Sequence, residues 1–172
     1  MIMKPKHLLV IIIFLCTTCA GLTQSYSEYY NSGLKKYNDG QYVSALADLQ
    51  KAGEIKKTES DLFNITALCY YMLSNFNNAL SNINKAITIK NDIADYYFNR
   101  GLINGELGGD SYAAINDYTL AIKYNSDYAN AYANRGVKYC NVDNWEKGCT
   151  DLKKALELGD MTVKQMINQY CK

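Results

Sequence analysis

Small residues recur along this chain at a nearly constant spacing. The first column is Gly33, Ala67, Gly101 and Gly136, at spacings of 34, 34 and 35 residues. A second column follows 12 or 13 residues later, at Ala45, Ala79, Ala114 and Gly148. A third column follows after seven more residues, at Ala52, Ala86, Ala121 and Ala155. Self-similarity of this period is typical of a stacked repeat array, and it constrains the fold more than any single motif does.

The columns have a physical explanation in pairs of antiparallel helices. Two helices approach closely only where their side chains are small, so the first column is expected in the first helix of each hairpin and the second column in the second helix. The third column lets the next hairpin stack, and at least three hairpins must stack to cover their apolar faces. Large residues are expected to fill the space before the second column: Tyr42, Phe76, Tyr112 and Trp145. The extra residue of the third repeat is assigned to the turn at Gly108-Gly109-Asp110.

Period, small columns and aromatic positions together resemble the tetratricopeptide repeat (TPR), and Asn99-Arg100-Gly101 and Asn134-Arg135-Gly136 match each other within that pattern. The resemblance covers residues 26–160 and implies an all-α, right-handed superhelical α-solenoid. It contains about four helix-turn-helix repeats, at about 26–59, 60–93, 94–128 and 129–160. Apolar residues at helical spacing in 161–172 predict a C-terminal capping helix, which makes nine helices in all.

The first twenty residues differ from the rest. A short basic start, Lys4 to His7, precedes an unbroken apolar run over 8–16, which is too short to span a bilayer. Small and hydroxyl residues follow, so residues 1–20 are predicted to be a signal peptide cleaved before Gly21. The chain is therefore expected to be secreted or periplasmic. An alternative is a lipoprotein acylated at Cys19, although Cys16-Thr17-Thr18 matches the usual lipoprotein pattern poorly.

The expected mature chain offers little for catalysis. The sole histidine, His7, leaves with the signal peptide, so no catalytic residue, cofactor site or metal site is predicted. Removing residues 1–20 takes away two lysines and no acid, which leaves 16 basic and 17 acidic residues. A nearly neutral chain has no electrostatic footprint for nucleic acid. No membrane-spanning segment is expected after signal removal, and the expected partner is another protein.

Two arginines and two aspartates recur at equivalent positions of repeats three and four. Arg100 and Arg135 precede their column glycines, and Asp117 and Asp151 lie three residues after the second column. Repeat two lacks both members, having Thr66 and Asn82 instead. One interpretation is a ligand-facing arginine pair. The favoured interpretation is an Arg–Asp bond that braces the helices, because guanidinium and carboxylate pair with fixed, bidentate geometry.

Four cysteines remain in the expected mature chain, at positions 69, 140, 149 and 171. An even number in an exported chain permits disulfides, with three pairings. Cys149 opens the second helix of the last repeat and Cys171 ends the predicted cap, so a bridge between them would tie the cap to the array. The alternative is that all four are small buried thiols.

The resemblance also implies a binding surface, because TPR proteins line a concave groove with their first helices. The matching positions here are Tyr30, Leu34, Tyr37, Asn64, Leu68, Tyr71, Phe98 and Leu102. TPRs that hold acidic chaperone tails present cations from this groove, whereas this chain has Asp95, Asn99, Asn130 and Asn134. The predicted function is therefore a non-enzymatic scaffold or adaptor that binds a peptide or helix of another protein. An envelope-anchored lipoprotein with a structural role in assembling a surface complex is the alternative.

Overall fold

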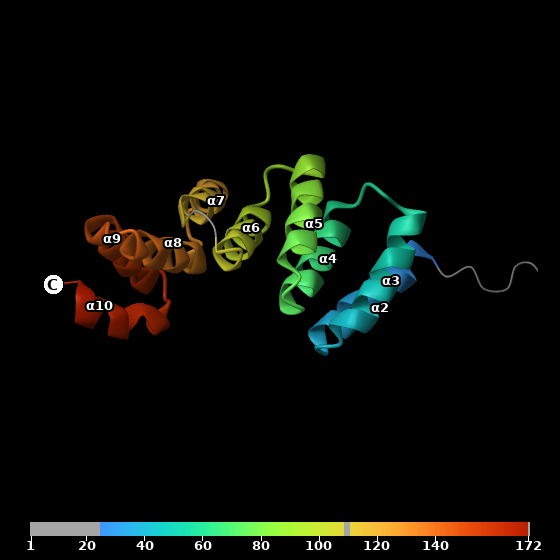
Figure 1. The fold of residues 1–172 in the computed structure, drawn as a ribbon, viewed down its shortest axis with the longest axis horizontal. Coiled ribbons are helices and arrows are strands. Elements are labelled where there is room, and N and C mark those ends of the chain that lie inside the picture. The colour runs from blue at the N-terminus through green and yellow to red at the C-terminus, as the bar shows by residue number, and fades with distance from the viewer. Residues whose placement is uncertain (1–24, 109–110, 172) are drawn as a thin grey trace, which may run out of the picture.

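The computed structural model describes residues 25–108 and 111–171, and this part of the chain is helical throughout (Figure 1). The helices are α2 (Tyr26–Asn38), α3 (Tyr42–Ile55), α4 (Ser60–Met72), α5 (Phe76–Ile89), α6 (Ala94–Glu106), α7 (Ser111–Tyr124), α8 (Ala129–Asn141) and α9 (Trp145–Glu157). A 3-10 turn (Met161–Val163) leads into α10 (Lys164–Tyr170). The predicted signal peptide, the lipidation candidate Cys19 and two residues of the predicted turn, Gly109 and Asp110, lie outside the described residues.

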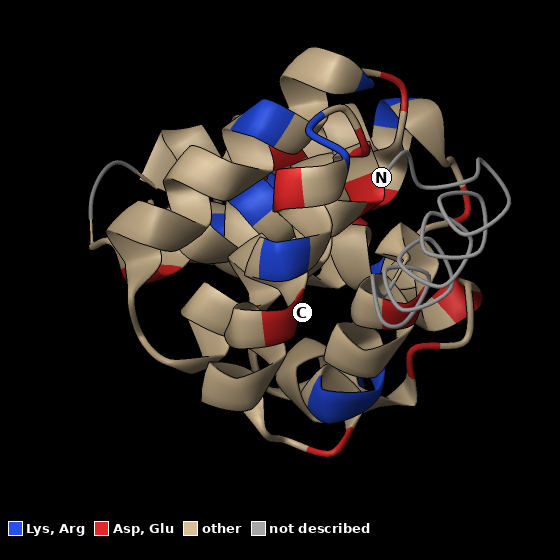
Figure 2. Ribbon diagram, turned by 90° about the vertical axis from the view of Figure 1, so that its right-hand side faces the viewer, with Lys and Arg blue, Asp and Glu red and all other residues tan. Residues whose placement is uncertain are grey.

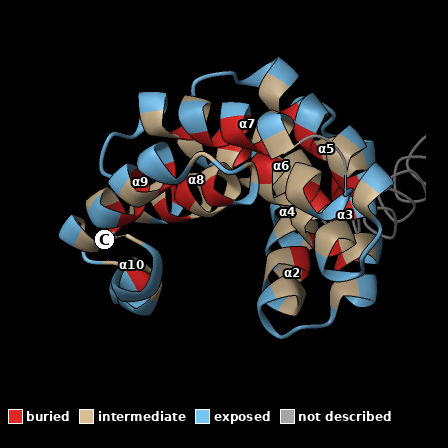
Figure 3. Cartoon of the chain, turned by 60° about the vertical axis from the view of Figure 1, so that its left-hand side comes forward, coloured by how far each residue is buried: buried red, intermediate tan, exposed pale blue. Residues whose placement is uncertain are grey.

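The first eight of these helices form four hairpins, each pairing one helix with the next: α2 with α3, α4 with α5, α6 with α7 and α8 with α9. The hairpins stack in chain order into an arch, with α4, α6 and α8 on its inner side and α3, α5 and α7 on its outer side (Figure 3). The first helices of successive repeats also contact one another, α2 with α4 and α4 with α6. The predicted all-α array of paired helices with a C-terminal helix is confirmed.

The ends of the hairpins use local polar groups. Ser25 caps α2 in a reciprocal capping box with Glu28, and Asn75 and Asn144 accept hydrogen bonds from the first turns of α5 and α9. Acidic and basic positions are interspersed along the helices (Figure 2). Within residues 25–108 and 111–171, the helices are too short or too polar for any of them to cross a bilayer.

The small columns lie where helices touch. Ala45, Ala79 and Ala114 of the second column are completely buried, as are all four alanines of the third column. Gly101 shows why the first column is small: a Cβ atom there would lie 2.6 Å from Cε1 of Tyr118, a core ring of the partner helix. Close packing of the two helices of a hairpin therefore selects small residues at these positions, as the repeat pattern predicted.

Two of the predicted space-filling aromatics behave differently. Tyr112 and Trp145 are 56% and 41% exposed, whereas Tyr42 and Phe76 are partly buried against the core. Trp145 instead packs against Tyr170 of the last helix, with ring centroids 5.5 Å apart. The predicted single capping helix is a 3-10 turn followed by seven helical residues, and Val163, Met166 and Ile167 pack on the last repeat.

Overpacking of the buried columns is expected to destabilise the chain. Ala79→Leu and Ala121→Leu each push three extra carbons into fully buried contacts, so each should cost about 1–3 kcal/mol of unfolding free energy. Ala47→Leu is the matched control, because Ala47 is an exposed alanine on α3. Thermal or urea unfolding measures the effect. Unchanged stability in both buried variants would show that these positions are not tight contacts.

The Arg–Asp pairs brace neighbouring repeats. Arg100 bonds Asp117 through Nε at 3.0 Å and Nη2 at 2.6 Å, and its Nη1 donates to Asn84 Oδ1 of the preceding repeat at 3.0 Å. Arg135 repeats this arrangement one hairpin later, with Asp151 as its carboxylate and Thr119 of the preceding repeat as its second acceptor. The bracing interpretation of the sequence pattern is confirmed.

Repeats one and two carry other residues at the positions of the Arg–Asp pair, and these form different hydrogen bonds. In repeat one, Ser32 and Lys36 both bond Asp48 at 2.6 Å, and this pairing lowers the pKa of the Asp48 carboxyl group. In repeat two, Thr66 and Asn82 each bond a backbone carbonyl four residues earlier in their own helix. No side chain therefore ties α4 to α3 in the way that Arg100 ties α6 to α5.

Candidate functional site

The predicted groove residues come from α2, α4 and α6, the first helices of repeats one to three. They occupy equivalent positions of the repeat, so each helix contributes residues from the same places along its length. All eight side chains are partly buried: Tyr30, Leu34, Tyr37, Asn64, Leu68, Tyr71, Phe98 and Leu102. Each of them therefore keeps a surface that a ligand can reach while its remainder is held by the fold.

The tyrosines of this row are each held by a second aromatic ring. Tyr30 stacks on Tyr26 with centroids 5.7 Å apart, and Tyr37 packs against Tyr42, also at 5.7 Å. Tyr71 meets Phe76 at 5.8 Å. Burial raises the pKa of Tyr30, Tyr37 and Tyr71, so these phenols are neutral at physiological pH. The row is thus a set of supported, uncharged rings.

Side chains of α6 contact both the preceding and the following parts of the array. Phe98 contacts the rings of Tyr118 and Tyr128, at centroid distances of 5.8 and 4.9 Å. Asn64 on α4 accepts a hydrogen bond of 2.9 Å from the Asn99 side chain on α6. The amide at position 64 therefore links repeats two and three.

Acidic residues at the start of α4 and α6 are engaged by the following repeat. Tyr96 donates to Asp61, and burial together with this bond raises the pKa of Tyr96 to about 12. Burial and a hydrogen bond to Asp95 likewise raise the pKa of Tyr128. These carboxylates stabilise the stacking of repeats. Among the described residues there is no cluster of His, Cys, Asp or Glu that could hold a metal ion.

A small hollow of about 250 Å³ lies at the turn after α4. It is lined by Tyr71, Met72, Ser74, Phe76 and Glu106. Met72 is 48% exposed, which is unusual for a methionine beside two aromatic rings. Of the eight predicted groove residues, Tyr71 lies in this hollow.

The row of tyrosines ends at repeat three for a reason that the sequence reasoning missed. Gly105 occupies the position of Tyr37 and Tyr71, and the Lys138 side chain of α8 lies over it. A Cβ at residue 105 would be 3.0 Å from Lys138 Nζ. At this end of the row, the Lys138 side chain therefore covers the position where repeats one and two have a tyrosine ring. The glycine itself, at a position where two other repeats carry tyrosine, was the available signal.

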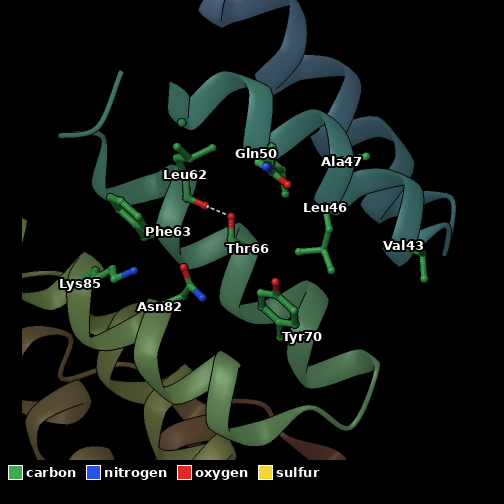
Figure 4. A pocket seen from close by; sticks show the side chains of 12 residues that line it. Val43, Leu46, Ala47, Gln50, Leu62, Phe63, Thr66, Tyr70, Asn82 and Lys85 are labelled. Atoms are coloured by element: carbon green, nitrogen blue, oxygen red, sulfur yellow. Dashed lines mark hydrogen bonds between the residues drawn. The ribbon is translucent and has the colours of Figure 1, made fainter. Parts of the chain in front are cut away.

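A larger hollow of about 560 Å³ lies between α3, α4 and α5 and contains none of the eight predicted residues (Figure 4). Its polar lining includes Gln50, Thr66 and Asn82, and its rings are Phe63 and Tyr70. The sequence did signal it indirectly. Thr66 and Asn82 replace the Arg and Asp of repeats three and four, and the hollow lies where that pair is missing.

Comparisons with known proteins agree with the repeat architecture. No family model matches the chain. A TPR repeat-containing protein of Methanocaldococcus jannaschii is 28% identical over 154 residues, which cover 90% of this chain and 27% of that protein. The crystal structure of MamA superposes with a TM-score of 0.74 at 22% identity, covering 81% of both chains.

A second solved structure is YrrB, described as a TPR protein with an unusual peptide-binding site. It matches with a TM-score of 0.73 at 21% identity, over 84% of this chain and 74% of YrrB. The chain has the fold of tetratricopeptide-repeat proteins. The chain spans about a quarter of the length of the archaeal protein that it matches. In this shared fold, α2, α4 and α6 correspond to the helices that the sequence resemblance assigned to the groove.

Proposed function

We propose that this TPR protein is an exported adaptor that holds an apolar peptide or short helix of one partner protein against the inner face of α2, α4 and α6. The observation that carries this proposal is the row of half-buried, uncharged side chains at equivalent positions of three repeats. Rings that are already supported by other rings lose little conformational freedom on binding. Aromatic residues of this kind commonly provide most of the energy of an interface.

The inner face favours an apolar ligand over a charged one. Its rings are neutral phenols and phenyl groups, and its acids at positions 61 and 95 already accept hydrogen bonds from tyrosines. A third acid, Glu106, lines the hollow beside Tyr71 and disfavours an anionic ligand there. Lys138 stands at one end, over Gly105. A ligand segment that lays aliphatic side chains along the tyrosines and ends with an acceptor near Lys138 matches this distribution.

The test is capture of the partner by variants of the inner row. Tyr37→Ala and Tyr71→Ala should each weaken binding by about 2 kcal/mol or more, which is about thirtyfold in affinity. Pull-down from native envelope extract identifies the partner, and titration with the purified partner measures the loss. Tyr124→Ala is the control, because Tyr124 is an exposed tyrosine on α7 that stacks on Tyr97 instead.

Stability must be measured beside binding, because both tyrosines also pack on the core. Met72→Lys provides a variant that avoids this difficulty, since Met72 is exposed in the hollow beside Tyr71. It should lower affinity without changing the melting temperature. Normal binding by all three inner-face variants would refute the inner groove as the site.

Export is the second component of the proposal and is tested separately. The predicted signal peptide gives a mature chain that begins at Gly21, whereas the alternative function, an anchored lipoprotein, requires acyl chains on Cys19. Intact mass spectrometry of the protein isolated from its host distinguishes the two. A mass that includes residues 1–20 without acylation would contradict both versions.

A further inference from the structure

The hollow between α3, α4 and α5 occupies the place that an arginine fills elsewhere in the array. In repeat four, the corresponding hollow is lined by Thr119, Arg135, Tyr139 and Asp151, together with Glu146, Lys147 and Thr150 at the start of α9. The corresponding residues of repeat two are Gln50, Thr66, Tyr70 and Asn82, and all four line the larger hollow. The volume is about 220 Å³ where Arg135 is present and about 560 Å³ where Thr66 replaces it. The hollow is therefore a vacated arginine site.

The walls of the vacated site are suited to a flat or branched apolar group. The Arg135 guanidinium lies 5.5 Å from the ring centre of Tyr132 and 6.0 Å from that of Tyr139. Phe63 and Tyr70 hold these two positions in repeat two and line the hollow without a guanidinium between them. Figure 4 shows Leu46 across the opening from Phe63, with Tyr70 beside it. Two rings and an aliphatic side chain thus bound an open space.

The two side chains that replace the Arg–Asp pair, Thr66 and Asn82, are neutral and form hydrogen bonds within their own helices. Thr66 donates to Leu62 O at 2.7 Å, and Asn82 donates to Asn78 O at 2.8 Å. Asn82 stands where the other pairs have a carboxylate, so a guanidinium from outside would find no acid. The vacated site therefore does not select another arginine.

The charge around the hollow points to an anionic occupant. Lys85 lines it and also lines an adjoining hollow of about 510 Å³, which Lys57 and Phe63 share. No Asp or Glu lines either of the two. Within the described part of the chain, neither Lys57 nor Lys85 forms an ion pair, and Lys85 Nζ lies 5.6 Å from the Phe63 ring centre. Two cations without an ion-pair partner thus flank an opening that Phe63 and Tyr70 line, and the acid beside it, Glu54, accepts a hydrogen bond of 3.4 Å from Gln50.

We propose that this outer hollow is a second docking site, which takes an acidic peptide segment of a partner protein with one aromatic or aliphatic side chain beside Asp or Glu. The apolar side chain enters the vacated arginine site between Phe63 and Tyr70. The adjacent carboxylate pairs with Lys85, and Lys57 receives a further acid along the adjoining hollow. This site lies on the outer side of the arch, so it is independent of the inner face of α2, α4 and α6.

The chain itself supplies the variant that closes the site. Thr66→Arg combined with Asn82→Asp recreates the Arg–Asp pair of repeats three and four, with Gln50 placed as the further acceptor. Net charge is unchanged, because one cation and one anion are added together. The double variant should fold with an unchanged or raised melting temperature, since the same arrangement is native in two other repeats.

The experiment selects a random 12-residue display library on the mature wild-type chain and, in parallel, on the T66R/N82D chain. Peptides enriched only on the wild-type chain should carry Asp or Glu next to an aromatic or aliphatic residue. In fluorescence anisotropy, the filled variant and Lys85→Glu should each weaken such a peptide about tenfold or more. Tyr37→Ala and Tyr71→Ala should leave its affinity unchanged.

Three results would overturn the proposal: equal selection by the two chains, wild-type-specific peptides that lack acids, or full affinity in the filled variant. None of them bears on the inner face, whose ligand is tested by the tyrosine variants. Conversely, loss of partner capture by Tyr37→Ala with retained peptide binding at the outer hollow would show two separate sites.

Discussion

Arg100→Thr should destabilise the chain by about 3–5 kcal/mol, because it strands a buried carboxylate. The Asp117 side chain is 5% exposed, and Arg100 provides three of its four hydrogen bonds. After the substitution only Asn104, at 2.8 Å, remains as a donor. Urea unfolding measures the loss as a lower midpoint with an unchanged slope.

The matched control copies repeat two. Arg100→Thr together with Asp117→Asn gives the Thr and Asn that occur natively at 66 and 82, where each side chain bonds its own helix backbone. The double variant should therefore recover most of the lost stability, because no charge is left buried. Lys35→Ala removes an exposed ion pair with Asp39 and should leave the midpoint unchanged. A double variant as unstable as Arg100→Thr would contradict this explanation.

The repeat pattern predicted the array because its causes are local and periodic. Each small column marks a backbone approach, so positions such as Gly101 and Ala79 report their neighbours directly. The Arg–Asp pattern was equally readable, since its two members are lost together in repeat two. The ends of the array were less predictable. Trp145 follows the periodic pattern, but the last repeat has no following hairpin, and Trp145 packs against Tyr170 instead.

The two proposed binding surfaces also differ in how far the sequence predicted them. The inner row follows from position within the repeat, so the sequence predicted its members and their shared register. The outer hollow depends on a missing side chain, and a volume left by an absent arginine becomes visible only when α3, α4 and α5 are placed in space. Lys138 over Gly105 is a similar case, because contact between adjacent repeats decides it.

Reduction of the disulfide between Cys149 and Cys171 is expected to release the C-terminal cap. The structure joins these two cysteines, as one of the sequence interpretations proposed, and they are 22 residues apart in the chain. The restraint that such a loop places on the unfolded chain corresponds to about 3 kcal/mol. The cap needs it, because α10 has seven residues and none of them is buried, and an isolated helix of that length does not persist in water.

The release is measured by amide hydrogen exchange of residues 161–171 and by melting, each with and without reductant. Reductant should raise exchange in the cap and leave α4 and α6 protected, since the bond is confined to the last repeat. The Cys149→Ser/Cys171→Ser chain is the control and should show the fast exchange whether or not reductant is added.

Peptide mapping without reductant tests the bond itself, and the other two cysteines serve as its internal standard. Cys69 and Cys140 are free and buried, and burial raises the pKa of the Cys69 thiol to about 11. Both should resist alkylation in the native chain and react once it is denatured. Cys149 and Cys171 should stay linked in both conditions, as expected in an oxidising compartment. Alkylation of all four cysteines in denaturant without reductant would show that the bridge is absent. The proposal of export would then lose the support that a disulfide gives it.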